Sequence, residues 1–366
     1  MKKRFIVVVA VLTIACVAFF GLTTTDTVNA APAAAAGKTY AGTVYVSAMG
    51  GHFAVADVTI DPSKESPIVV NSLDKIDIGN SKTHPTHDPR IDAKDRNIMY
   101  WSTYKLDANN KVHVGASDLK TGKVIKDEAI DLDPRAKWTG ALYCGSGQSN
   151  DFYIPLTMTD EAYIDVFDKK TMKLKHRVFL DYKPGETKFY HGTNTPDMKK
   201  FLVAVNLQTD GKLNGKIDLI MLDLKALENG KVKVLAKNTV TGEPGKTITF
   251  RQYFSTDGKT LYQSARDRML VVDANTLKVV DEEMVPSGEN HDVMPTPDGK
   301  YAVLTLREAV GKTADGKDIM DGTLQLYDVA AQKLVGKSSS ACKNCHSAAG
   351  VTGSAILCGM DANWKM

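Results

Sequence analysis

Short apolar stretches alternate with turn-forming residues along most of the chain, and this pattern predicts β-strands. The stretches are rich in Val, Ile, Leu, Tyr and Phe, and the residues between them are rich in Gly, Asp and Asn. The spacing of apolar residues that marks an amphipathic helix is nearly absent. Short strands separated by frequent turns predict an all-β fold.

The strand pattern repeats with a period of about 50 residues. In the last full unit, residues 301–306 form one apolar stretch, residues 324–328 form a second that ends in aspartate, and residues 333–335 form a third. We expect this aspartate to accept hydrogen bonds within the turn that follows it. The equivalent aspartates of the six units are Asp57, Asp118, Asp168, Asp223, Asp273 and Asp328.

Regularly spaced groups of four strands form the blades of a β-propeller. The six aspartates predict six blades, and a seventh is the alternative if residues 355–360 pair independently. The first unit lacks its innermost strand, whereas the residues beyond Val335 supply an extra one. We therefore expect the C-terminal strand to complete the N-terminal blade, and residues 38–366 to form one propeller domain.

The units resemble the YVTN-type propeller repeat, in which a strand, a Pro-Asp-Gly turn and an Asp-Thr turn recur. The turn Thr-Pro-Asp-Gly-Lys at residues 296–300 and the turn Asp-Ala-Asn-Thr at residues 273–276 match this repeat. The resemblance covers essentially the whole chain after residue 37. It implies the propeller fold but no particular function, because propellers host many activities.

The N-terminus predicts a secretory signal peptide. Lys2, Lys3 and Arg4 precede an apolar run over residues 6–21, and Val-Asn-Ala at residues 28–30 fits a cleavage site. A membrane anchor is the alternative, but the run is shorter than the roughly 20 residues that a span needs. We expect cleavage near Ala30, a linker over residues 31–37, and export to the periplasm or an equivalent oxidising compartment, with no membrane span after cleavage.

The formal net charge of +3 is near zero for 366 residues. Charges of both signs are mixed along the chain, so composition gives no indication of binding to nucleic acid or to an anionic membrane surface.

The segment Cys342-Lys-Asn-Cys345-His346 has the pattern of covalent haem attachment. Two thiols at this spacing bind the two vinyl groups of one c-type haem, and the adjacent histidine binds the iron as the proximal ligand. The alternatives are a disulfide between Cys342 and Cys345 or another metal site. A zinc site would need a second cysteine pair nearby, and only Cys358 follows. The distal iron ligand is not fixed, with Met198, Met294, Met360 and several histidines as candidates.

Polar side chains recur about ten residues before successive apolar strands, at a phase that places them at one mouth of the propeller channel. His346 falls near this phase in the last unit. A structural role in turns is the alternative to a functional ring. The remaining cysteines, Cys144 and Cys358, either form a disulfide between blades or are buried separately. The recurring side chains are His87, Tyr143, His191, Arg251 and His291.

These features predict an exported redox propeller that carries one haem c. The architecture is similar to that of the nitrite-reductase-type haem propellers and of the propeller subunit of hydrazine synthase, which implies a redox partner protein or the other subunits of a multihaem complex. Whether the chain is itself an enzyme stays open; if it is, it is an oxidoreductase or a subunit of one. Two alternatives are a haem-free scaffold subunit of such a complex and a propeller with copper on its histidine ring.

Overall fold

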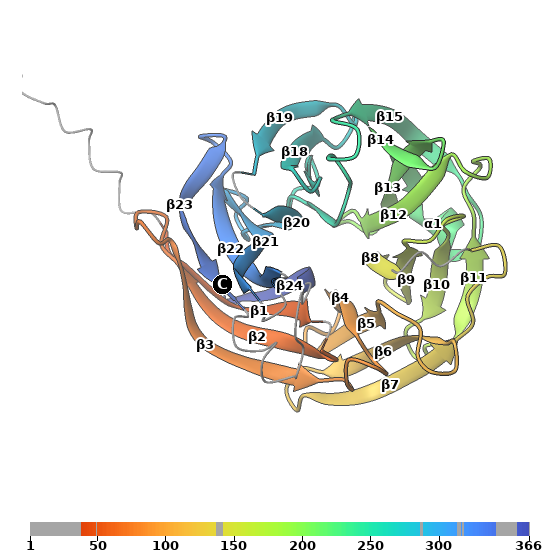
Figure 1. The fold of residues 1–366 in the computed structure, drawn as a ribbon, viewed down its shortest axis with the longest axis horizontal. Helices are drawn as coiled ribbons and strands as arrows, with labels where there is room; N and C mark the ends of the chain where they lie inside the picture. The colour runs from red at the N-terminus through yellow and green to blue at the C-terminus, as the bar shows by residue number, and fades with distance from the viewer. Residues whose placement is uncertain are drawn as a thin grey trace, which may run out of the picture. The chain divides into compact units, whose positions relative to one another are not determined.

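Six antiparallel sheets of four strands each are arranged as the blades of a propeller, as Figure 1 shows. The structure is a computed structural model, which describes residues 38–48, 50–136, 142–285, 288–312, 316, 318–341 and 357–365. The predicted signal peptide and linker, residues 1–37, and the predicted haem motif, residues 342–346, lie outside the described residues. All of the sheets belong to one unit, residues 36–366.

The first three blades take their strands in order from the propeller axis outward. Blade one consists of β24 (Leu357–Lys365), β1 (Tyr40–Ala48), β2 (His52–Ile60) and β3 (Ile68–Asp77). Blade two consists of β4 (Thr86–Ile91), β5 (Ile98–Thr103), β6 (Val112–Asp118) and β7 (Lys123–Ile130). Blade three consists of β8 (Tyr143–Gln148), β9 (Phe152–Thr157), β10 (Ile164–Asp168) and β11 (Leu174–Val178).

The other three blades follow the same plan. Blade four consists of β12 (Thr187–Asn194), β13 (Lys200–Thr209), β14 (Lys212–Asp223) and β15 (Val234–Thr241). Blade five consists of β16 (Gln252–Phe254), β17 (Thr260–Ser264), β18 (Arg268–Asp273) and β19 (Val279–Met284). Blade six consists of β20 (Glu289–Pro295), β21 (Tyr301–Lys312), β22 (Asp318–Asp328) and β23 (Lys333–Ser340). One short helix, α1 (Leu224–Glu228), follows β14, and no helix within the described residues is long and apolar enough to span a membrane.

Burial falls from the axis outward. All six residues of β8, the inner strand of blade three, are buried, whereas most residues of β7, the outer strand of blade two, are exposed. Inner strands are covered on both faces by the adjacent blades, so even their polar residues are buried, as throughout β4, while outer strands cover a blade from one side only. The apolar cores accordingly lie between consecutive blades, for example where Ile154 and Val166 of blade three meet Phe201 and Val203 of blade four.

The C-terminal strand closes the ring, as the sequence predicts. β24 pairs with β1 in antiparallel register, with Val46 opposite Met360 and Tyr45 opposite Asp361. It is also bound to the neighbouring blades, because Asp361 Oδ2 accepts a hydrogen bond from the backbone N–H of Ile91 (2.8 Å) in blade two. The last strand is therefore part of blade one, and the alternative of a seventh blade is wrong.

The repeated aspartate acts as a turn cap in four of the six blades and as a helix cap in a fifth. The Oδ1 atom of Asp273 accepts hydrogen bonds from the backbone N–H groups of Asn275 (3.1 Å) and Thr276 (2.7 Å), and Asp118, Asp168 and Asp328 repeat this arrangement. Asp223 instead caps α1, where its side chain accepts from the N–H of Ala226. Asp57 differs, because β2 continues to Ile60 and its carboxylate bonds the hydroxyls of Thr43 and Ser72.

Candidate functional site

The six innermost strands all begin at one end of the propeller, because each is entered from the outermost strand of the preceding blade. We call this the entry end. Most of these strands carry a β-bulge near their first residues. In β8 the register passes from Tyr143 to Gly145 and leaves Cys144 as the extra residue, and in β20 it passes from Asn290 to Asp292 and leaves His291. Bulges re-aim side chains, and these two turn a thiol and an imidazole toward each other.

Three ligand-type side chains from blades two, three and six meet near the axis. Ligand atoms of His87, Cys144 and His291 all lie within 4.8 Å of one another, and the three residues are buried. Cys144 Sγ lies 3.9 Å from His291 Nε2, and the rings of His87 and His291 are 6.2 Å apart between centroids. We call these three residues the axial cluster. The predicted convergence of His87 and His291 is present, but the side chains are fully buried and do not line an open mouth.

The protonation of both cluster histidines follows from their hydrogen bonds. His87 Nδ1 bonds the backbone carbonyl of Tyr143, and His291 Nδ1 lies 3.0 Å from Asp292 Oδ2. A carbonyl or carboxylate oxygen only accepts, so each Nδ1 carries the proton and each Nε2 presents a lone pair. Burial lowers the pKa of His291 to about 4 and holds that of His87 well below its ordinary value, so both imidazoles are neutral at pH 7.

His191 lies beside the axial cluster but is not part of it. Its side chain is fully buried, and neither ring nitrogen has a hydrogen-bond partner among the described residues. Phe250 contacts both histidines: its ring stacks on His291 at 4.6 Å and lies edge-on to His191 at 5.8 Å. His191 is buried because blades three and four approach each other closely at this point. A Cβ at Gly145 would lie 3.2 Å from the Cα of His191, so a glycine is needed there. The Gly-Ser-Gly segment of β8 is thus a packing feature.

Arg251 ties opposite sides of the propeller together across the axis. Its guanidinium lies 2.8 Å from Asp88 Oδ1 of blade two and 2.9 Å from Asp292 Oδ1 of blade six. It also donates to the carbonyls of Pro89 and Met360, each at 3.0 Å. All three charged side chains are at most 1% exposed. Arg251, predicted as a ring member, is therefore the centre of a buried ion network.

The two carboxylates of this network differ in their electrostatics. Burial raises the pKa of Asp88, and the opposing effect of Arg251 does not compensate. For Asp292 burial acts in the same direction, but Arg251 and the hydrogen bond from His291 outweigh it and lower the pKa. Asp292 is thus the firmly ionised member, and it links the ion network to the axial cluster.

Tyr143 does not occupy the position predicted for it. Its hydroxyl donates a hydrogen bond to Asp165, and its ring packs in the core that includes Val112 and Val114 of blade two. The bulge at the start of β8 gives the axial position to Cys144 instead. The prediction misses this because a one-residue bulge reverses which side chain faces the axis.

A second set of ligand-type atoms lies on blade two, where His84 Nε2 is 2.9 Å from Asp127 Oδ2 and His113 Nδ1 is 2.8 Å from Asp127 Oδ1. Here the nitrogens that face the carboxylate are engaged as hydrogen-bond partners. The hydrogen bond to Asp127 raises the pKa of His113. This set is a hydrogen-bonded pair of histidines on one aspartate.

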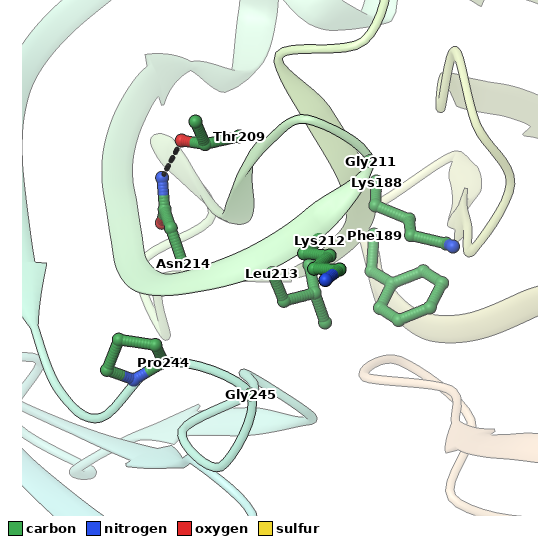
Figure 2. Close-up of a pocket in the computed structure, with 9 residues that line it drawn as sticks. All are labelled: Lys188, Phe189, Thr209, Gly211, Lys212, Leu213, Asn214, Pro244 and Gly245. Carbon is green, nitrogen blue, oxygen red and sulfur yellow. Dashed lines mark hydrogen bonds between the residues drawn. The ribbon is translucent and has the colours of Figure 1, made fainter.

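A surface hollow of about 600 Å³ lies beside the first residues of β12. Figure 2 shows that its lining comes from β12, from the β13–β14 hairpin and from the connection between β15 and β16. Phe189 and Leu213 supply its apolar surface, and Lys188 and Lys212 its charge. Phe189 also packs against the buried group that holds Cys144 and Phe250, so the hollow lies near the axial cluster at the entry end.

No family model and no characterised protein matches the chain by sequence. Among solved structures, it is similar to Kuenenia stuttgartiensis hydrazine synthase, with 16% identity and a TM-score of 0.45, over 67% of this chain and 63% of that chain. The match thus spans less than two thirds of that chain.

Two other solved structures match over more of their length. A chain of the nidogen/laminin complex has 10% identity and a TM-score of 0.56, covering 89% of this chain and 98% of that one. A protein of unknown function from Bacteroides caccae has 10% identity and a TM-score of 0.51, covering 88% and 98%. At such identities the similarity establishes the propeller fold alone.

Proposed function

We propose that this protein is an exported redox propeller that carries one covalently attached haem c, and that it transfers electrons alone or as a subunit of a multihaem oxidoreductase complex. Cys342 and Cys345 form the thioether bonds in this proposal, and His346 is the proximal iron ligand. The expected signal peptide supports it, because such a peptide would direct the chain to a compartment in which haem attachment takes place.

One observation carries the proposal: the six four-stranded sheets are complete without the segment that holds the motif. Residues 341–356 join β23 to β24, and this is the longest of the six connections that lead from an outer strand to the next inner strand. Cys342, Cys345 and His346 lie in this connection, outside the described residues. A Cys-X-X-Cys-His pattern in such a segment is better explained by attachment than by packing.

The described residues also narrow the choice of distal iron ligand. Met360 is fully buried in β24 and packs in the core between blades one and six. Met198 follows the last residue of β12, and Met294 lies near the last residue of β20. Both methionines are therefore at the opposite end of the propeller from the entry end. The connection that carries the haem motif leads into β24 at the entry end. These three methionines are therefore poor candidates, and we propose that the distal ligand comes from a partner or from a residue at the entry end.

The optical spectrum of the protein purified from the periplasm of its source tests this function. We expect a reduced-minus-oxidised difference spectrum with the sharp bands of a c-type haem. His346→Ala should keep the haem attached but change these bands, because the iron loses its proximal ligand while both thioethers remain. His176→Ala, on the exposed part of β11, is the matched control and should change nothing. A colourless wild-type protein would favour the haem-free scaffold alternative.

A further inference from the structure

We propose that His87, Cys144 and His291 bind a single copper ion at the propeller axis. The proposal does not depend on the haem, since none of the three residues belongs to the haem motif. The donor spacing fits one metal ion. Bonds of about 2.0 Å to nitrogen and about 2.3 Å to sulfur hold the two donors roughly 3.5–3.7 Å apart in tetrahedral or trigonal geometry. The observed distance from Cys144 Sγ to His291 Nε2 is 3.9 Å.

The histidines are oriented as metal ligands are. A ligating histidine usually donates its second ring N–H to a carboxylate or a backbone carbonyl, which fixes the ring and directs the other nitrogen at the metal. His291 does this with Asp292, and His87 does it with the carbonyl of Tyr143. His87 Nε2 is then a buried lone pair with no hydrogen-bond partner among the described atoms. An ordinary core histidine would leave this nitrogen uncompensated, at a cost that a metal bond removes.

The donor set and its burial indicate copper. Two imidazoles and one thiolate in a trigonal arrangement are characteristic of single-copper electron-transfer sites, and copper(II) also exceeds zinc in affinity for a given set of such ligands. On binding, Cys144 releases its thiol proton to solvent, while both histidines bind through lone pairs they already present. A copper(I) ion and one thiolate together carry no net charge, so the site can remain dry without the large penalty of a buried charge.

Among the described residues, the surroundings supply three protein donors. Phe250 stacks on the ring of His291, and Tyr104 packs against His87 at 4.6 Å between ring centroids. His191 contacts the ring of Phe250. Its ring nitrogens are not among the ligand atoms that lie within 4.8 Å of one another. We therefore expect His191 to contribute to packing and not to ligation.

Metal analysis of the full-length protein, exported into the periplasm of a host grown with added copper, tests the proposal. A Cys342→Ala, Cys345→Ala background removes the absorbance of any haem, so failure of the haem proposal and failure of the copper proposal are distinguishable. We expect one copper per chain, and in the copper(II) form an intense visible band from thiolate-to-copper charge transfer. Less than one tenth of an equivalent of copper in a folded protein overturns the proposal, as does one equivalent of zinc in the presence of excess copper.

Single variants then assign the ligands. Cys144→Ser should abolish the charge-transfer band, and His87→Gln should lower the copper content at least tenfold. His52→Gln is the matched control, because His52 is equally buried and neither of its ring nitrogens has a partner among the described residues, yet it lies outside the cluster. It should retain full copper. If the band survives in Cys144→Ser, the proposed donor set is wrong.

Discussion

Replacing Arg251 by methionine should destabilise the propeller more than any surface substitution, because Arg251 links blades on opposite sides of the axis. The change leaves the carboxylates of Asp88 and Asp292 buried without their cation. It also removes one donor each from the carbonyls of Pro89 and Met360, the latter keeping its hydrogen bond from the hydroxyl of Tyr253. Methionine is similar in length, so the loss is mainly electrostatic.

The magnitude follows from the geometry of this network. Removal of one partner from a buried ion pair costs about 3–5 kcal/mol, since the remaining charge stays desolvated. Asp88 can take up a proton, because burial already raises its pKa, but Asp292 is held ionised by Arg251 and His291. We therefore expect a loss of about 3–5 kcal/mol. At about 2 °C per kcal/mol for a large domain, this lowers the unfolding midpoint by about 6–10 °C.

Thermal and denaturant unfolding of the purified variant measure this loss. The matched control is Arg266→Met, because Arg266 pairs with Glu289 at the surface (2.6 Å) and such pairs contribute at most about 1 kcal/mol. Adding Asp88→Asn and Asp292→Asn to Arg251→Met should recover part of the stability, since no unpaired charge then remains. A loss below about 1 kcal/mol for Arg251→Met alone would refute the assignment of a buried ion network at the axis.

Three further predictions concern the repeat, the closure and the pH response. Asp273→Ala should cost about 1 kcal/mol in denaturant unfolding because the turn loses its cap; an unchanged midpoint would contradict the capping role. Deletion of residues 354–366 should remove more than about 5 kcal/mol, enough to abolish a cooperative transition, because β1 loses its inner partner; a normal transition would contradict closure by β24. His113, whose pKa is raised by Asp127, stabilises the fold fully below pH 6.5, and this contribution disappears as the pH rises through its folded pKa. Wild type should therefore lose up to about 1 kcal/mol relative to His113→Gln between pH 6 and pH 9, and parallel pH profiles of the two would disprove the pairing.

The repeat could be interpreted from sequence because each blade makes the same contacts. Strand, turn and capping aspartate are local features, so they recur with the period, and even the closing strand follows from one missing and one extra stretch. Asp57 is the exception, because its side chain bonds neighbouring strands and not its own turn. The period thus predicts the architecture wherever the local bonding is repeated.

The axial cluster could be predicted only in part. The phase of the repeat places His87 and His291 together. The bulge that turns Cys144, and not Tyr143, toward the axis cannot be recognised from the spacing of apolar residues. The ion network could have been anticipated from a second repeated feature of the sequence. An aspartate directly follows each of the two histidines, namely Asp88 after His87 and Asp292 after His291. Full burial of these charged residues depends on how closely the blades approach, which is a property of the assembled ring.

The intact mass of the mature protein under denaturing conditions tests the central claim most directly. Two thioether bonds survive denaturation, so wild type exported by a host with haem-attachment machinery should exceed the mass of its polypeptide by one haem. The Cys342→Ala, Cys345→Ala variant should have the mass of the polypeptide alone. Wild type without the added mass, or a double variant that still carries it, would contradict the account of this chain as a haem-bearing redox propeller.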